Sequence, residues 1–355
     1  MYIQLNTVRK SLLTIFLLLT TIISLSYLLG SCRKESRIKE LELLQQDIPS
    51  GFPVPAYNFS DNPLSTEGFE LGRKLFYDGR LSIDNATPCS SCHQQIAGFG
   101  TFEHDRSHGV NNSHTLRNAP GLFNLAWNTS FHWDGKYTTL VDAIAQPING
   151  HIEMGESFNG VISKIQDDPA YRESFKKVFG YPFIRPEYIL KALAQFIGYM
   201  VSANSKYDRY KKGTESFSPQ EENGYQVYKA NCATCHPEPL FTDYSYRNIG
   251  LPVDNFLKDY GRLMITGKAE DSLKFKVPTL RNTYISSNYM HDGRMGTLAQ
   301  CVNHYRNSVQ QSSTLDPLLA TGITLTNTQT TDLLLFLRAL TDSAFIQDPR
   351  FRQPD

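Results

Sequence analysis

Six side chains in this 355-residue chain have the types and spacing needed to hold a redox cofactor. They form two C-x-x-C-H motifs, whose members are Cys89, Cys92 and His93, and Cys232, Cys235 and His236. The motif is typical of c-type haem, in which two thiols form thioethers to one porphyrin and the histidine binds the iron. Two C-x-x-C pairs also occur in four-cysteine zinc sites, which is the alternative. The histidine after each pair, the wide separation and an N-terminal export signal favour two haems.

The N-terminus has the pattern of an exported lipoprotein. Two basic residues precede an apolar run over residues 12–29, and a Leu-Gly-Ser-Cys sequence then ends at Cys32. A basic start followed by such a run is typical of a secretory signal. We predict a signal peptide at residues 1–31, lipidation of Cys32, a tether at residues 32–60 and a membrane-anchored location in the periplasm. The alternative is an uncleaved anchor helix, because the run is close to membrane-spanning length.

The composition is that of a globular protein without a charge preference. Hydrophobic residues make up 40% of the chain and charged residues 20%, and the formal net charge at pH 7 is zero. Neither a basic excess nor a polycationic tract is present, so binding to nucleic acid or to a lipid surface through charge is not expected. The length is sufficient for two domains of ordinary size.

Helix signals precede both motifs. The sequence predicts helix starts near Ser65 and Ser218, where a hydroxyl side chain is followed by Glu two or three residues later. Further helices are predicted to begin near Pro186 and to present an apolar face at residues 333–340. Strand-type alternation is hardly visible.

The two halves of the chain repeat a pattern. A glycine, an aliphatic residue and an aromatic residue recur at equal spacing, as Gly72, Leu75 and Phe76 and as Gly224, Val227 and Tyr228. This indicates an internal duplication at the scale of a domain. We therefore predict an all-α fold with two cytochrome c-like domains, at residues 61–206 and 207–355, each with one covalently bound haem.

Four further runs are Glu70–Asp78, Arg117–Pro120, Trp133–Gly135 and Tyr289–Arg294. In this order and at these separations they resemble the bacterial diheme cytochrome c peroxidases, a family that includes MauG-like enzymes. The resemblance covers most of residues 50–345. It implies that the first haem is the site of hydrogen peroxide chemistry and that the second handles electrons. His93 and His236 would be the proximal iron ligands.

The resemblance assigns proton transfer to Glu153. Heterolytic cleavage of peroxide moves a proton from one oxygen to the other, and a positioned carboxyl group contributes about 10²–10⁴-fold to such a step. Glu153 follows Trp133 by twenty residues, as the family pattern requires. The glutamine that accompanies this glutamate in the family aligns with Ala143 here, and Gln146 is a nearby substitute.

Two more assignments follow from the resemblance. Trp133 aligns with a tryptophan that relays electrons between the haems. Asn118 resembles a ligand of an interhaem calcium ion, and the backbone carbonyls of Ser286 and Asn288 would be further ligands. Calcium takes six to eight oxygen ligands, often carbonyls and waters. The family has proline at the position of Asn288, which is a departure from its pattern.

The distal ligand of the second haem separates the branches of the family. The candidates are Met290, Met295 and Tyr305. In typical members a methionine lies fourteen residues after the histidine of an H-x-G motif, and counting from His291 places Tyr305 there, as in MauG-like proteins. Methionine raises a haem potential, whereas tyrosine is an anionic oxygen ligand that favours ferric iron. We predict Tyr305 as the ligand, with Met290 as the alternative.

The first iron is predicted to be open. Many relatives carry a histidine that caps this iron in the resting oxidised state, and the aligned residue here is Val110. His108 and His114 flank Val110 on a predicted loop, and either could swing in. The interpretation that we favour is that both are solvated loop histidines.

Together these patterns predict an enzyme that reduces hydrogen peroxide to water with electrons from a c-type cytochrome or a similar small carrier. The family also suggests a homodimer. One alternative is a MauG-like oxidant that stores two oxidising equivalents across both haems and oxidises a partner protein, which Tyr305 favours. The other alternative is a non-catalytic diheme electron-transfer cytochrome with six-coordinate iron at both sites.

Overall fold

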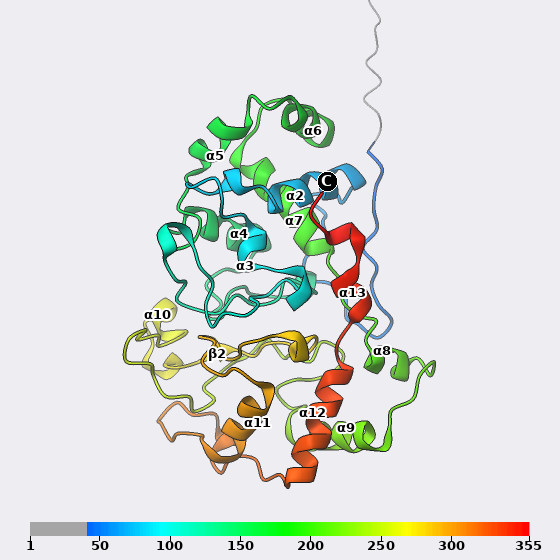
Figure 1. Ribbon diagram of the computed structural model, residues 1–355, viewed down its shortest axis with the longest axis vertical. Coiled ribbons are helices and arrows are strands. Elements are labelled where there is room, and N and C mark those ends of the chain that lie inside the picture. The colour runs from blue at the N-terminus through cyan, green and yellow to red at the C-terminus, as the bar shows by residue number, and fades with distance from the viewer. Residues whose placement is uncertain (1–40, 355) are drawn as a thin grey trace, which may run out of the picture. The chain divides into compact units, whose positions relative to one another are not determined.

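The computed structural model describes residues 41–354, in which helices are joined by long irregular segments (Figure 1). The strands in this range form one two-stranded antiparallel sheet. The prediction of a helical fold is thus confirmed at the level of a helix-rich chain with few strands. The predicted signal peptide and Cys32 lie outside the described residues. Within residues 41–354, no helix combines the length and the hydrophobicity needed to cross a membrane.

The α-helices are α2 (Thr66–Phe76), α3 (Cys89–Cys92), α4 (Leu140–Asn149), α5 (Phe158–Ile165), α6 (Pro169–Phe179), α7 (Pro186–Tyr199), α8 (Lys206–Lys211), α9 (Pro219–Asn231), α10 (Leu263–Thr266), α11 (Leu298–Asn307), α12 (Asn327–Ala339) and α13 (Ser343–Gln347). The strands are β1 (Tyr246–Arg247) and β2 (Phe275–Lys276). The 3₁₀ helices are Gly79–Leu81, Gln95–Ala97, Val110–Asn112, Leu125–Trp127, Ala269–Asp271, Thr283–Ile285, Pro317–Leu319 and Pro349–Phe351.

The predicted helix starts are confirmed, and side-chain caps explain them. The Ser65 hydroxyl accepts a hydrogen bond from the Gly68 N–H at 3.0 Å, which satisfies a free donor in the first turn of α2. Ser218 and Glu221 form a reciprocal capping box at the start of α9. Because such caps depend on residues only a few positions apart, the sequence is sufficient to reveal them.

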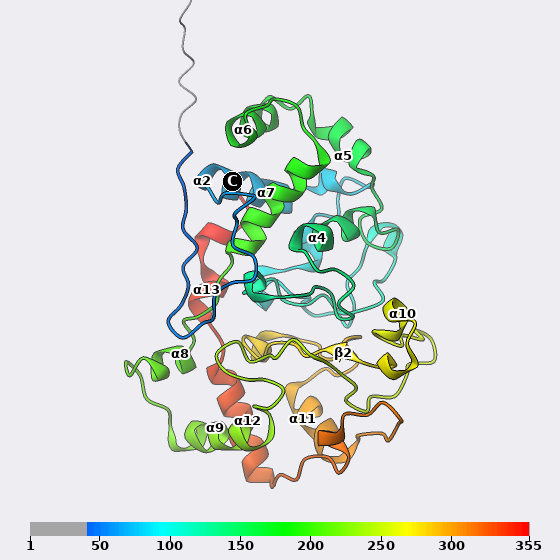
Figure 2. The same cartoon turned by 180° about the vertical axis from the view of Figure 1, so that it is seen from behind.

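The repeated glycines mark the same helix crossing in both halves. A Cβ atom on Gly72 would lie 2.0 Å from the Ala192 carbonyl oxygen, and one on Gly224 would lie 1.9 Å from the Asp332 carbonyl oxygen. Only glycine permits these approaches of α2 to α7 and of α9 to α12 (Figure 2). Each C-x-x-C-H motif therefore follows a helix that packs closely against a later helix of its own half.

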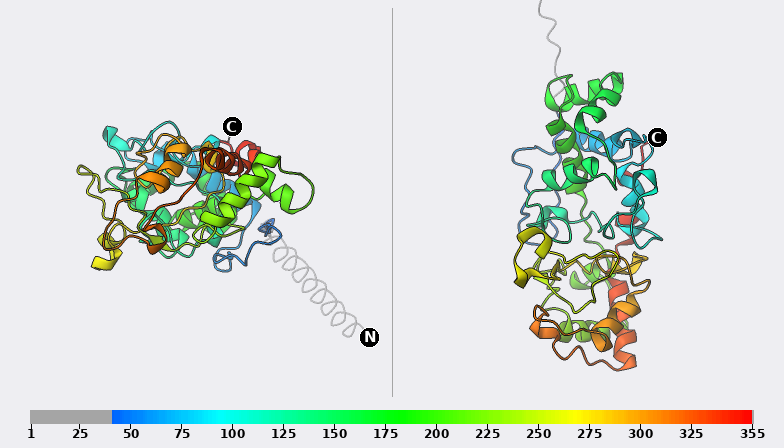
Figure 3. Two further views of the ribbon diagram at one scale, coloured as in Figure 1. Left: turned by 90° about the horizontal axis from the view of Figure 1, so that it is seen from below. Right: turned by 90° about the vertical axis from the view of Figure 1, so that its left-hand side faces the viewer.

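Two main clusters of buried hydrophobic residues form the core. One is built mostly from residues 69–200 and the other from residues 207–340. Phe345 and Phe351 belong to the first cluster, because the chain crosses back after α12 and places α13 beside the first half (Figure 3). The Tyr77 hydroxyl donates to the Phe351 carbonyl oxygen at 2.8 Å, which fixes the returning segment.

Residues 41–60 belong to the predicted tether, and they pack against the helical part. The Trp127 indole N–H donates to the Pro53 carbonyl oxygen at 2.7 Å, and the Phe52 ring meets the Trp127 ring edge-on at 5.2 Å between centroids. The Leu44 N–H donates to the Leu64 carbonyl oxygen at 3.0 Å. This part of the segment is therefore attached along its length.

Candidate haem-binding sites

The second motif lines a pocket with a largely apolar surface in the second half of the chain. Cys232, Cys235 and His236 follow the end of α9 and contribute to its wall. His236 Nδ1 lies 3.1 Å from the Phe241 carbonyl oxygen and 3.0 Å from that of Pro278. Carbonyl oxygens only accept, so Nδ1 carries the proton and Nε2 keeps its lone pair. Burial lowers the pKa of His236, and the neutral imidazole suits an iron ligand.

The first motif repeats this arrangement. Cys89 and Cys92 are the ends of α3, and His93 follows as its C-terminal cap. His93 Nδ1 lies 2.7 Å from the Phe99 carbonyl oxygen, which again leaves Nε2 free. Burial lowers the pKa of His93 to about 4, so its ring is neutral at physiological pH. Both histidines are therefore held in the tautomer that iron binding needs.

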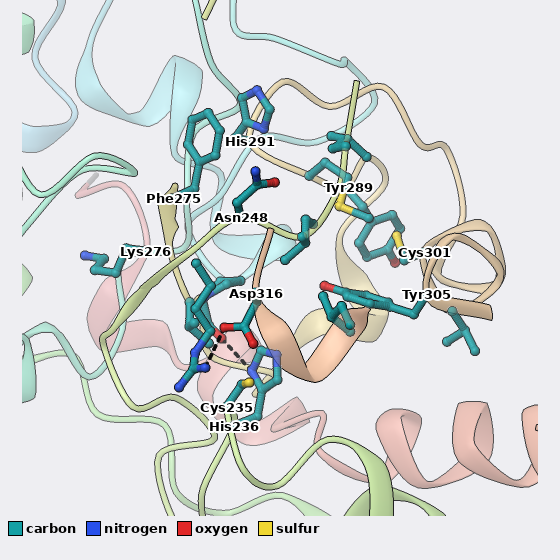
Figure 4. Close-up of a pocket in the computed structure, with 18 of the residues that line it drawn as sticks. Cys235, His236, Asn248, Phe275, Lys276, Tyr289, His291, Cys301, Tyr305 and Asp316 are labelled. Atoms are coloured by element: carbon teal, nitrogen blue, oxygen red, sulfur yellow. Dashed lines mark hydrogen bonds and ion pairs between the residues drawn. The ribbon is translucent and has the colours of Figure 1, made fainter. Parts of the chain in front are cut away.

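The three candidate distal ligands of the second site lie in different places. Tyr305 and Met290 line the pocket that contains His236, whereas Met295 lines a separate surface depression beside α11. The Tyr305 hydroxyl points from α11 into the pocket (Figure 4). Burial raises the pKa of Tyr305, so a phenolate would form there only beside a strong positive charge such as ferric iron.

Glu153 lies close to the first motif. Its charge is near enough to raise the pKa of Cys92, and its own pKa is raised by burial, while Gln146 and Lys136 oppose that shift. Oxygen Oε2 of Glu153 is buried and has no hydrogen-bond partner among the described residues. A buried carboxyl oxygen without a partner is costly, and it indicates that a further group belongs beside it.

The loop between the first motif and Glu153 places the apolar residue Val110 against the backbone of Glu153. Val110 is 2% exposed, and its N–H donates to the Glu153 carbonyl oxygen at 2.8 Å. His108 and His114 are exposed, and their ring centroids lie 4.3 Å apart across an isolated bridge of the loop.

Trp133 connects the two halves. It precedes α4 of the first half, yet it lines the pocket of the second half. Its indole N–H donates to the Asn118 carbonyl oxygen at 2.8 Å, and its own carbonyl oxygen accepts from the Lys276 N–H at 2.7 Å. The first bond holds the indole ring, and the second joins the Trp133 backbone to β2 of the second half.

Both carbonyl oxygens expected to bind calcium already accept hydrogen bonds, whereas Asn118 uses its side-chain nitrogen. The Asn118 amide donates to the Asp105 carbonyl oxygen at 2.9 Å. The Ser286 carbonyl oxygen accepts from the Tyr289 hydroxyl at 2.8 Å, and the Asn288 carbonyl oxygen accepts from the Ser286 hydroxyl at 2.9 Å. No group of three or more His, Cys, Asp or Glu side chains suited to a metal ion occurs in residues 41–354. Calcium remains a prediction, and no chemical step is derived from it.

Sequence reasoning missed two features around Trp133. Arg117 pairs with Asp259 of the second half at 2.6 Å and with Asp134 of the first half at 2.6 Å, which ties the two halves together. In addition, the pattern D-G-x-x-x-T-L occurs at residues 134–140 and again at residues 292–298. Its threonines cap α4 and α11, which occupy equivalent places in the two halves. Tyr305 lies on α11, whereas Glu153 follows the end of α4. That repeat was visible in the sequence, whereas the ion pairs were not.

The residues present fit a haem at each site. Each has two thiols at thioether spacing and a neutral histidine with a free Nε2. The second site adds an apolar pocket, and the first adds a carboxyl oxygen that lacks a partner within the described range.

Comparisons with known proteins agree with this geometry. A sequence profile described as di-haem cytochrome c peroxidase matches residues 66–216. The MauG protein of Methylophilus methylotrophus is 33% identical over 311 residues, which cover 85% of this chain and 89% of the relative. The cytochrome c551 peroxidase of Nitrosomonas europaea is 36% identical over 244 residues, or 68% of this chain and 73% of the relative.

A solved structure is similar along nearly its whole length. It is a crystal structure of a MauG-like protein associated with microbial copper homeostasis, and it superimposes with a TM-score of 0.82 at 32% sequence identity. The match covers 88% of this chain and 99% of that chain. With the motifs and the sequence relatives, this similarity shows that the chain belongs to the di-haem cytochrome c peroxidase family, among whose members are proteins named MauG.

Proposed function

We propose that this protein is an envelope-anchored peroxidase with two c-type haems, which reduces hydrogen peroxide to water with electrons from a c-type cytochrome or a similar small carrier. The observation that carries the proposal is the buried carboxyl oxygen of Glu153, which has no partner in the described part of the chain and lies near Cys92. Membership of a family that includes cytochrome c peroxidases supports it.

At the first site, Cys89 and Cys92 would hold the porphyrin and His93 would bind its iron. When bound, the haem supplies an iron at which peroxide can be reduced. Glu153 in its ionised form would take a proton from one peroxide oxygen and return it to the other, which leaves as water. The net reaction consumes two electrons and two protons and forms two water molecules. Buried surroundings strengthen this proton transfer because they exclude competing water.

At the second site, Cys232, Cys235 and His236 would hold the other haem, with Tyr305 as the distal ligand and Met290 as the alternative. Trp133 is proposed to relay electrons toward the first site, because it belongs to the first half but lines the pocket of the second. The hydrogen bond of its indole N–H keeps the ring in one position, which favours repeated transfer.

One experiment tests the proposal directly. The purified holoprotein, checked by mass spectrometry for two haems, is mixed with reduced c-type cytochrome and hydrogen peroxide. We expect two cytochrome molecules to be oxidised for each peroxide. The variant Glu153→Gln should keep both haems and lose most of the rate. Cytochrome oxidation that does not depend on peroxide would contradict the proposal.

A second candidate function is that of a MauG-like oxidant of a partner protein. It is supported by Tyr305 in the second pocket and by the similarity to MauG of Methylophilus methylotrophus. This candidate predicts peroxide-dependent modification of aromatic residues on a partner, with little turnover of reduced cytochrome. A simple electron carrier would instead show neither reaction, and its reduced form would not bind carbon monoxide.

A further inference from the structure

The lining of the pocket in the second half includes a lysine that forms no ion pair among the described residues. Lys276, the last residue of β2, lines this pocket, and its Nζ donates to the Ser130 carbonyl oxygen of the first half at 2.7 Å. Within residues 41–354, no aspartate or glutamate oxygen lies within 4.0 Å of this ammonium group. An ammonium group has three N–H donors, so most of its capacity is not used.

The other basic residue of the same pocket wall differs from Lys276. Arg247 pairs with Asp243 at 2.8 Å and with Asp316 at 2.7 Å. Among the acidic residues of the wall, Asp259 pairs with Arg117 and Asp292 with Arg294, whereas Asp254 accepts backbone N–H groups and has no ion pair among the described residues. Of the two basic side chains of this wall, Arg247 is therefore paired with carboxylates of the described residues and Lys276 is not.

An enclosed charge of this kind is energetically unfavourable. The Lys276 side chain is half-buried. Burial lowers the pKa of Lys276 to about 8, although the charge of Asp134, which is beyond ion-pair distance, opposes this shift. Transfer of a charge out of water is tolerated when the charge is paired and hydrogen-bonded, so an anion is expected beside this group.

The cofactor of this site brings such anions. A haem carries two propionate groups on the edge opposite the two positions that form thioethers. Cys232 and Cys235 would hold the thioether edge, so the residues that bind the propionates would belong to another part of the pocket wall. Lys276 lies across the pocket from Tyr305 and Cys301 (Figure 4), at the contact with the first half.

We propose that Lys276 binds a propionate of the second haem and forms an ion pair with it at the junction of the two halves. The proposal rests on the two-haem assignment above. Because the Lys276 N–H donates to the Trp133 carbonyl oxygen, this contact also ties one edge of the second haem to the segment that carries Trp133. A positive charge beside the haem favours ferrous over ferric iron, so Lys276 also raises the reduction potential of that haem.

The test compares Lys276→Met with Lys274→Met in the two-haem protein. Lys274 is a matched control, since its ammonium group lies 3.8 Å from Asp271 and is partly exposed. Resonance Raman spectra report the propionate bending modes, and a redox titration reports both potentials. In Lys276→Met we expect one propionate band to move. We also expect the reduction potential of one haem to fall by at least 59 mV, which is a tenfold change in the ratio of ferric to ferrous iron for a one-electron couple. Lys274→Met should change neither, and Lys276→Arg should restore both.

The outcomes separate the two proposals. A wild-type chain that carries fewer than two haems would contradict the proposed function. Two haems with unchanged propionate bands and potentials in Lys276→Met would overturn the propionate contact alone. If Lys276→Met does not accumulate, Lys276→Gln removes the charge but keeps a hydrogen-bond donor, and its potential should still fall. An unchanged potential in that variant would overturn the proposal equally.

Discussion

The backbone N–H of Val110 donates to the carbonyl oxygen of Glu153 at 2.8 Å. The loop that follows the first haem motif thus holds the segment carrying the buried carboxyl, and it does so through a residue with an apolar side chain. The Val110 side chain is buried and has no atom that can bind iron. The neighbouring histidines, His108 and His114, are exposed.

This arrangement predicts that the fully oxidised protein reacts with peroxide without prior reduction. A stopped-flow measurement of the oxidised holoprotein with hydrogen peroxide should show a prompt change in the Soret band. The reason for this expectation is that Val110, aligned with the capping histidine of many relatives, has no side-chain atom that can bind iron. A change that begins only after one electron has been added would contradict the prediction.

The variant Glu153→Gln should lose about 10²–10⁴-fold in the rate of its reaction with peroxide, because the amide cannot shuttle a proton. Stopped-flow kinetics at several peroxide concentrations give this rate. Glu173→Gln, on an exposed face of α6, is the matched control and should react like the wild type. Equal loss in both variants would point to a general effect of charge.

Glu153 should also make stability depend on pH. Burial raises its pKa above the unfolded value of about 4.3, so between the two values the folded protein binds more protons than the unfolded chain. Stability then falls as pH rises through this window. The side chain at this position cannot ionise in the variant Glu153→Gln, so the variant does not lose this stability. The difference in free energy of unfolding between variant and wild type should therefore change in favour of the variant as pH rises from acidic to neutral. Guanidinium unfolding across this range measures the difference, and a constant difference would exclude the effect.

Tyr305→Phe should change one haem and leave the other as it is. If the phenol binds the second iron, the low-spin ferric signal in the electron paramagnetic resonance spectrum should vanish or move. The high-spin signal of the first haem should remain. Identical spectra of wild type and variant would show that Tyr305 is only a packed side chain, and Met290 would then be the leading ligand because it lines the same pocket.

Gly224→Ala should destabilise the second half, although alanine is normally better than glycine in a helix by about 0.5–1 kcal/mol. The new Cβ would lie 1.9 Å from the Asp332 carbonyl oxygen, and such overpacking costs about 1–3 kcal/mol. Guanidinium unfolding gives the difference. Gly160→Ala is the comparison, because its Cβ would meet the side-chain carboxylate of Glu156 rather than a backbone group. That carboxylate can move away from Lys164 and Ser157, so we expect this variant to lose less stability than Gly224→Ala.

Local patterns in the sequence were sufficient for the haem motifs and for the helix starts. The thiols and histidine of each motif lie within five residues, and the caps at Ser65 and Ser218 act on N–H groups three positions away. Thioether attachment and helix capping both depend on short separations along the chain. The duplication around Gly72 and Gly224 was also visible in the sequence. Each glycine lies at a close helix contact that excludes every other residue type, so glycine recurs at the same place in both halves.

Only the tertiary structure decided which distant residues share a site. Sequence spacing left three distal candidates, and the fold separates Met295 from the pocket that Tyr305 and Met290 line. Arg117 and Asp259 are 142 positions apart, and Lys276 and Ser130 are 146 positions apart. Charge pairing and burial depend on distance in space, and no local pattern encodes those distances. Residue types alone therefore predicted the cofactor, while the packing of the two halves decided which charged side chains form ion pairs and placed Lys276, which forms none within the described residues, against Ser130 of the first half.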